Sequence, residues 1–140
     1  MTVQAPHLLQ FPPAALKVGQ VVVLDWHDGP REGFLRIDNP LSCWRYRLYA
    51  EARREDDLDD RLYLFSLAPD DALQRLIEVL TELGPIKEPL WVPMWRFPND
   101  EAQRTADQAI TALITEVEEP VLLVRSAGLL QLQELWLLVP

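Results

Sequence analysis

Residues 43–52 read CWRYRLYAEA, and the alternation of their side chains decides the fold. Successive side chains of a β-strand point to opposite faces of the sheet, so every second residue shares a face. The two faces would carry Trp44, Tyr46, Leu48 and Ala50 on one side and Cys43, Arg45, Arg47, Tyr49 and Glu51 on the other. We therefore expect a strand whose aromatic face packs on a core, while its arginines pair with acidic residues on a neighbouring strand.

Three further segments around this strand have the composition of strands. They are QVVVLDW (residues 20–26), GFLRID (33–38) and RLYLFSL (61–67), each rich in β-branched or aromatic residues. The turn-forming sequence DGP (28–30) separates the first two, and the charged stretch RREDDLDD (53–60) precedes the last. Four strands joined by short polar turns predict an antiparallel meander.

Two helices are predicted to follow the meander. The first is expected to begin after Pro69 and to end at Gly84-Pro85, with an apolar stripe of Leu73, Leu76, Ile77, Leu80 and Leu83. The second is expected to run from a cap at Asn99 to about Val117. Its apolar stripe is Ala102, Ala106, Ala109, Ile110, Leu113 and Val117. The three alanines indicate close packing against a neighbouring element.

The two ends of the chain complete the predicted fold. The apolar run PVLLVRS (120–126) is typical of a strand covered on both faces. Residues 127–139 could form a strand or a helix, although LWLLV favours a strand, and residues 1–19 with three prolines are expected to form an extended arm. Strands followed by helices indicate the α+β class. We predict one domain over residues 1–140, with a single mostly antiparallel sheet, a four-strand meander plus one or two C-terminal strands, and both helices on one face.

The composition restricts the partners. Thirteen Lys and Arg against 22 Asp and Glu give a net charge of −9, which disfavours nucleic acid and suits a basic protein partner. No apolar run reaches the roughly 18 residues of a membrane span, so we expect no membrane segment. Cys43 is the single cysteine, which excludes an internal disulfide and multi-cysteine metal sites. We expect a protein of bacterial type in a reducing cytoplasm, without cofactor.

The stretch DWHDG (25–29) is the one place where acid–base or metal chemistry could gather. Asp25 and His27 would share a strand face, with Asp28 next to them. A metal site needs three or four ligands, and the other histidine, His7, lies far away in the N-terminal arm. Asp28, Gly29 and Pro30 are also typical turn residues. We therefore favour a hairpin turn and keep a polar site as a minority hypothesis.

The loop between the two helices, PIKEPLWVPMWRFP (85–98), is the most unusual segment. Four prolines reduce the entropy that is lost on ordering it, and long connections of this kind are often functional. Its residues could seal the open end of the core or bind a partner, since Trp and Arg dominate binding hot spots. The candidate binding residues are Trp91, Met94, Trp95, Arg96 and Phe97. The acidic turn at residues 51–60 is a second candidate docking surface for a basic protein.

These observations favour a non-enzymatic protein-interaction module, immunity-like or regulatory, over an enzyme. The chain has no Gly-x-Ser-x-Gly setting and no glycine-rich phosphate motif. One alternative is a small-molecule-binding domain with a pocket between sheet and helices that is lined by Trp26, Trp44, Trp91 and Trp95. A less favoured alternative is a hydrolase or metal enzyme that uses Asp25, His27 and Asp28.

Overall fold

The computed structural model describes residues 7–11, 18–26, 30–38, 41–54, 57–84, 97–127 and 131–139, and side chains within residues 18–25, 30–38, 41–50, 61–84 and 97–125. The elements in this part of the chain are β1 (His7–Phe11), β2 (Val18–Trp26), β3 (Pro30–Asp38), β4 (Leu41–Arg54), β5 (Asp57–Ala68), α1 (Ala72–Glu82), α2 (Asp100–Ile114), β6 (Pro120–Ala127) and β7 (Gln131–Val139). In the described part of the chain, neither helix has the length and apolar composition needed to cross a membrane.

All described strands belong to one sheet, in the order β1-β7-β6-β5-β4-β3-β2, and every neighbouring pair is antiparallel. The predicted α+β class is confirmed, and the predicted four-strand meander corresponds to β2 through β5. The open question over residues 127–139 is resolved, because residues 131–139 form β7. The predicted N-terminal arm also contributes a strand, since β1 pairs with β7 from His7↔Val139 to Phe11↔Leu135.

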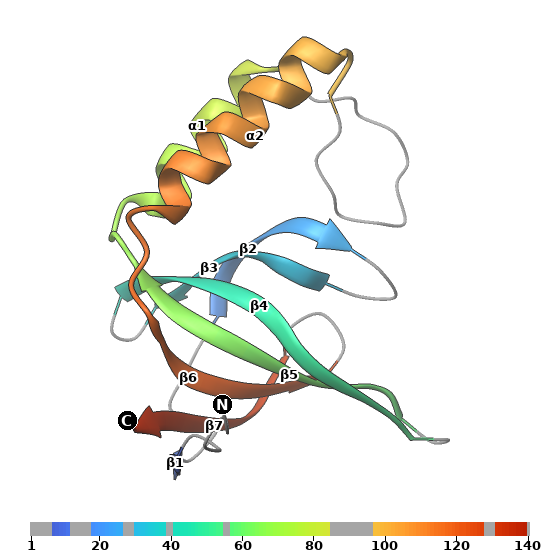
Figure 1. The fold of residues 1–140 in the computed structure, drawn as a ribbon, viewed down its shortest axis with the longest axis vertical. Helices are drawn as coiled ribbons and strands as arrows, with labels where there is room; N and C mark the ends of the chain where they lie inside the picture. Colours follow the sequence, from blue (N-terminus) through green and yellow to red (C-terminus); the bar gives the residue numbers. More distant parts are fainter. Residues whose placement is uncertain are drawn as a thin grey trace, which may run out of the picture.

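The sheet is rolled, and chain length requires this. β1 and β2 lie at opposite edges, yet only six residues separate them in sequence. Strands about 4.8 Å apart would place the edges of a flat seven-strand sheet roughly 29 Å from each other. The chain from Phe11 to Val18 spans about 25 Å at most. Figure 1 shows the resulting curve, from β2 and β3 near the helices round to β7 and β1.

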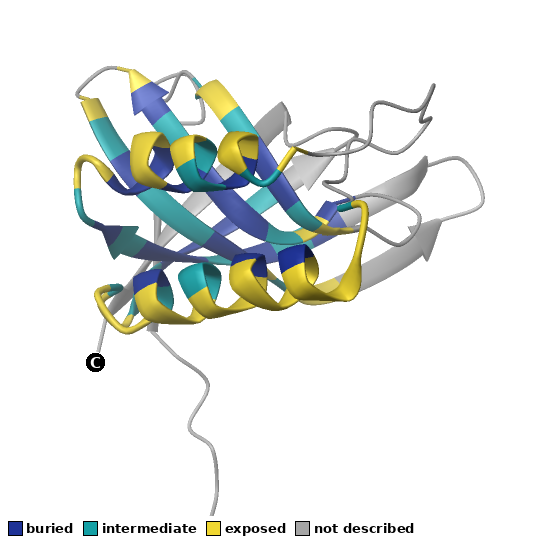
Figure 2. Cartoon of the chain, turned by 90° about the horizontal axis from the view of Figure 1, so that it is seen from above, coloured by how far each residue is buried: buried dark blue, intermediate teal, exposed yellow. Residues whose placement is uncertain are grey.

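The outer face of the sheet packs under the two helices, which lie side by side above it (Figure 2). Buried residues from both layers form this helix-side core: Val22, Phe34, Cys43, Ala68, Ala72, Leu73, Leu76, Leu80, Ala106 and Leu113. The predicted stripes of both helices point into it. Of the three alanines expected to pack closely, Ala102 and Ala106 are buried and Ala109 is half-buried.

The inner face forms a second core, which we call the inner core: Leu35, Ile37, Tyr46, Tyr63, Phe65, Leu122 and Val124. The rings of Tyr46 and Tyr63 meet edge to face, with centroids 5.7 Å apart and an interplanar angle of 84°. Gly33 pairs with Tyr46 across the strands, and a Cβ at Gly33 would collide with the Val22 carbonyl and approach the Tyr46 hydroxyl to 2.6 Å. Tyr46 donates to that carbonyl (3.4 Å), and burial raises the pKa of its hydroxyl, so it remains a donor.

The helix ends follow local chemistry. The side chain of Asn99 accepts a hydrogen bond from the Ala102 amide at 2.8 Å, as expected for an N-cap, and confirms the predicted start of α2. Gly84 has φ 65°, the left-handed conformation that terminates helices. The predicted end of α1 at Gly84 is therefore confirmed.

Leu80→Ala should destabilise the fold by about 2–5 kcal/mol, because Leu80 is fully buried in the helix-side core and truncation leaves a cavity. Denaturant unfolding would measure this change. The exposed neighbour Glu82→Gln is the control and should alter stability by less than about 0.5 kcal/mol. Equal, small effects from both variants would contradict the packing of α1 described here.

Candidate functional site

One of the five candidate binding residues in the predicted aromatic loop falls within the described residues. Phe97 is half-buried and packs against the helix-side core, so it anchors the C-terminal end of the loop beside α2. The other predicted binding residues, Trp91, Met94, Trp95 and Arg96, lie outside the described residues. Their role as a binding surface stays a prediction.

The DWHDG stretch lies where β2 turns into β3. Trp26 pairs with Pro30 across residues 27–29, as a hairpin requires. The carbonyl of Pro30 accepts hydrogen bonds from the Tyr63 hydroxyl (2.5 Å) and from Arg61 (3.2 Å), which fixes the first residue of β3. Asp25 is exposed, while His27 and Asp28 lie outside the described residues. Among the described side chains, no group of three His, Cys, Asp or Glu residues could hold a metal ion.

The predicted charged turn at residues 53–60 is shorter than expected. β4 continues to Arg54 and β5 begins at Asp57, with Arg54 paired to Asp57. Most of the acidic stretch is therefore strand, because the hairpin continues through it. Its side chains lie outside the described set.

Two residues considered in the sequence, the single cysteine Cys43 and the proposed pocket residue Trp44, have structural roles. Cys43 is only 2% exposed, and its thiol donates to the Asp70 carbonyl at 3.1 Å, so it ties β4 to the segment before α1. Trp44 is half-buried against the inner core, with its ring 6.3 Å from that of Phe65 and its indole N–H donating to Ser42 at 2.8 Å. Trp44 therefore faces away from the helices, and a pocket between sheet and helices would not use it.

The strongest surface feature is the charge of the helices, which we call the acidic helical layer (described residues 70–84 and 97–119). Ten Asp and Glu residues stand there against two arginines, a net charge of −8 out of −9 for the whole chain. All twelve charged side chains are exposed. The ten acidic residues are Asp70, Asp71, Glu78, Glu82, Asp100, Glu101, Asp107, Glu116, Glu118 and Glu119.

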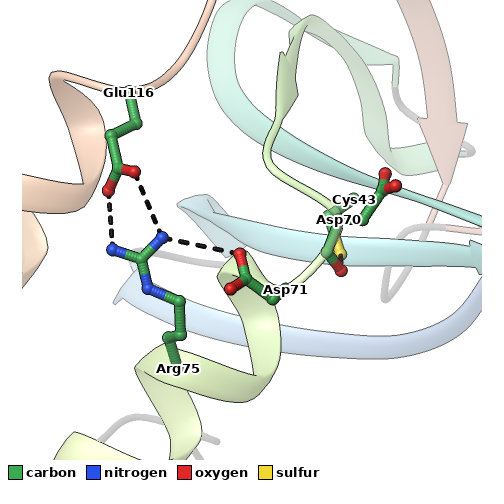
Figure 3. A network of polar contacts seen from close by, with 5 residues as sticks. All are labelled: Cys43, Asp70, Asp71, Arg75 and Glu116. Carbon is green, nitrogen blue, oxygen red and sulfur yellow. Dashed lines mark hydrogen bonds and ion pairs between the residues drawn. The ribbon is translucent and has the colours of Figure 1, made fainter.

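Arg75 neutralises part of this layer (Figure 3). Its guanidinium donates to both carboxylate oxygens of Glu116, at 3.2 and 2.7 Å, and lies 3.5 Å from Asp71. The hydrogen bond from Arg75 lowers the pKa of Glu116, and the same bond raises the pKa of Arg75. The pair's small stabilisation is therefore complete above the ordinary pKa of Glu and is lost as pH falls through the lowered value. The other eight carboxylates make no ion pair within the described residues.

A pocket of about 350 Å³ lies between α1 and the outer face of the sheet, and we call it the Arg36 pocket. Its walls are Gln20, Arg36, Leu41, Cys43, Asp70, Leu73, Gln74, Ile77 and Glu78. This pocket could not be predicted from the sequence, because Gln20, Arg36 and Cys43 come together only through strand register. The acidic helical layer was also missed, although counting charges within the predicted helices would have found it.

Comparisons of this chain with models of protein families, with curated proteins and with solved structures found no match.

If DWHDG is a hairpin turn, zinc, nickel and manganese at modest excess should leave the thermal midpoint of unfolding unchanged. The reason is that tight metal sites need three or four converging ligands, and the pairing of Trp26 with Pro30 fits a turn. Thermal melts and metal analysis of the purified protein would test this. A stoichiometric metal that disappears in His27→Ala would contradict the hairpin interpretation.

Proposed function

We propose that this protein is a non-enzymatic protein-interaction module whose partner is a basic protein that docks on the acidic helical layer. The observation that carries the proposal is the segregation of charge: a net −8 on the exposed side chains of the two helices and the segments that flank them, in a chain whose total is −9. Surfaces usually intersperse both signs of charge, whereas a large field of one sign suits the steering of a charged partner.

The physical consequence of this segregation is long-range steering. Clustered charges of one sign attract an oppositely charged partner and accelerate its encounter, with a strong dependence on ionic strength. The same surface repels phosphate backbones and anionic lipids. Both effects support a basic protein as the partner and disfavour nucleic acid or membrane.

The aromatic loop fits this proposal. It connects α1 to α2, and the C-terminal end of α1 and the N-terminal end of α2 lie at the same end of the helical layer (Figure 1). Tryptophan and arginine supply most of the binding energy at interfaces, while surrounding charges contribute steering. Trp91, Trp95 and Arg96 would then form the energetic centre, and the carboxylates of both helices its surroundings. The acidic stretch at residues 51–60 remains a second candidate contact.

The alternatives have less support. The inner-face position of Trp44 removes one of the four residues proposed for a Trp-lined ligand pocket. The metal-enzyme alternative would need ligands beyond Asp25, His27 and Asp28. A protein-interaction module of this kind could have an immunity-like or regulatory role, in which an acidic protein neutralises a basic one. We also propose a cytoplasmic location, because a chain with the single cysteine Cys43 forms no internal disulfide, as is usual in a reducing compartment.

Neutralising the helical layer should weaken partner capture. The triple variant Glu82→Gln, Asp107→Asn, Glu118→Gln removes three exposed carboxylates from both helices and the segment after α2. We expect the wild type to retain a basic protein from a lysate of the source organism at about 50 mM salt and to release it at about 300 mM, because salt screens surface charges. The triple variant should retain several-fold less, quantified by mass spectrometry.

Asp25→Asn is the matched control, because Asp25 is exposed on the sheet rather than on the helices. It should leave capture unchanged. Equal capture by the wild type and the triple variant, or a captured partner that is itself acidic, would contradict the proposal.

The aromatic loop gives a separate test. If Trp91 or Trp95 serves recognition, its replacement by Ala should change stability little but weaken binding of the captured partner by about 2 kcal/mol or more. A ring that only seals the core should instead destabilise the fold by about 3–5 kcal/mol. Denaturant unfolding together with calorimetric titration separates the two roles. Loss of stability in both variants, with binding unaffected in the folded fraction, would move the binding surface away from the loop.

A further inference from the structure

The Arg36 pocket is built from three strands in register and one helix. Gln20 pairs with Arg36 between β2 and β3, and Arg36 pairs with Cys43 between β3 and β4, so the three residues form a row on the outer face. α1 passes beside this row and adds Leu73, Gln74, Ile77 and Glu78. Rigid elements therefore supply most of the pocket, which favours a preformed binding site.

The positive charge of Arg36 is already used within the sheet. Its Nε donates to Asp38 at 2.8 Å, and its guanidinium donates to the side-chain oxygen of Gln20 at 3.5 Å. Because Asp38 neutralises Arg36, the net charge of the pocket comes from its carboxylates. An anionic ligand would therefore have to compete with Asp38.

Two carboxylates of the pocket have no cationic partner within the described residues. Asp70 contacts Cys43 through its backbone carbonyl, which leaves its exposed carboxylate without an ion pair. Glu78 is exposed and accepts only a hydrogen bond from the neutral side chain of Gln74, at 3.2 Å. The potential of the pocket is therefore negative and would attract a cation.

The pocket also offers apolar surface beside these carboxylates. Leu41 is 62% exposed, one of the large exposed apolar side chains of the described residues, and Ile77 is half-buried next to it. Leu73 and Cys43 are buried beneath them. Apolar surface next to negative charge suits a long side chain with an alkyl stem and a cationic end. A volume of about 350 Å³ lies at the small end of ligand pockets, in keeping with one side chain.

We propose that the Arg36 pocket receives one lysine or arginine side chain of the basic partner. The alkyl stem lies on Leu41 and Ile77, and the cationic end lies near the carboxylates of Asp70 and Glu78. This inference rests on the proposed function and makes it more specific: the helical layer attracts the partner, and the pocket selects a basic side chain.

The test uses small probes and the full chain. N-acetyl-arginine amide and Nα-acetyl-lysine amide would be titrated into the ¹⁵N-labelled protein at low salt and followed by NMR. We expect saturable shifts centred on the amides of Arg36, Leu41, Leu73 and Ile77, with affinities on the order of millimolar for ligands of this size. N-acetyl-leucine amide tests the apolar contribution alone and should bind more weakly.

Glu78→Gln should weaken binding of the cationic probes by about threefold to tenfold, because it removes one carboxylate beside the cation. Asp25→Asn, on β2 and outside both the pocket walls and the acidic helical layer, is the control and should have no effect. Equal binding by the leucine probe, no saturable shifts, or identical effects of the two variants would overturn the inference.

The outcome can be separated from that of the proposed function. Charge-dependent capture of a basic partner, combined with no probe binding, would retain the function and reject the pocket. Probe binding with Glu78 dependence, combined with capture that the triple helical variant leaves unchanged, would retain a cation pocket and reject the helical layer as the docking surface.

Discussion

A sheet that is apolar on both faces must be covered twice, and most of this structure follows from that requirement. Phe34 and Leu35 are neighbours on β3, point to opposite faces, and are both fully buried. Two helices can cover one face only. The other face is covered because the sheet rolls and its own strands close over it, which the six residues between β1 and β2 also demand.

The rolled interior depends on a few close contacts. Gly33 on β3 leaves room for the ring of Tyr46, whose hydroxyl reaches across β3 to the carbonyl of Val22 on β2. Tyr63 reaches the carbonyl of Pro30 in the same way. Each phenol satisfies its polar atom while its ring fills the core, so buried aromatics fix the register of β2, β3 and β4. The described side chains of this interior are buried against one another.

The sequence predicted the features that repeat locally. The alternation in residues 43–52 predicted the strand, and both faces proved to be in use, since Cys43 enters the helix-side core and Tyr46 the inner core. The expected pairing of Arg45 with an acidic neighbour is also confirmed, by its 2.6 Å ion pair with Glu32. Contacts set by register could not be predicted. The pairing of β1 with β7 joins residues more than a hundred positions apart, and the Arg36 pocket depends on three strands in one alignment.

The acidic helices could still be explained as an ordinary solvated surface, and the position of Glu82 argues against that explanation. Asp100 and Glu101 lie in the first turn of α2, where negative charge stabilises the helix dipole. Glu82 ends α1, where the dipole favours a cation, and neither helix has a basic residue in its last turn. Opposite charges three or four residues apart stabilise helices, but only Arg75 and Arg104 supply the positive partner in this layer, and Asp71–Arg75 is the sole such ion pair among the described side chains. Lysine or arginine at these positions would stabilise the helices more, so the excess of carboxylates supports the proposed basic partner.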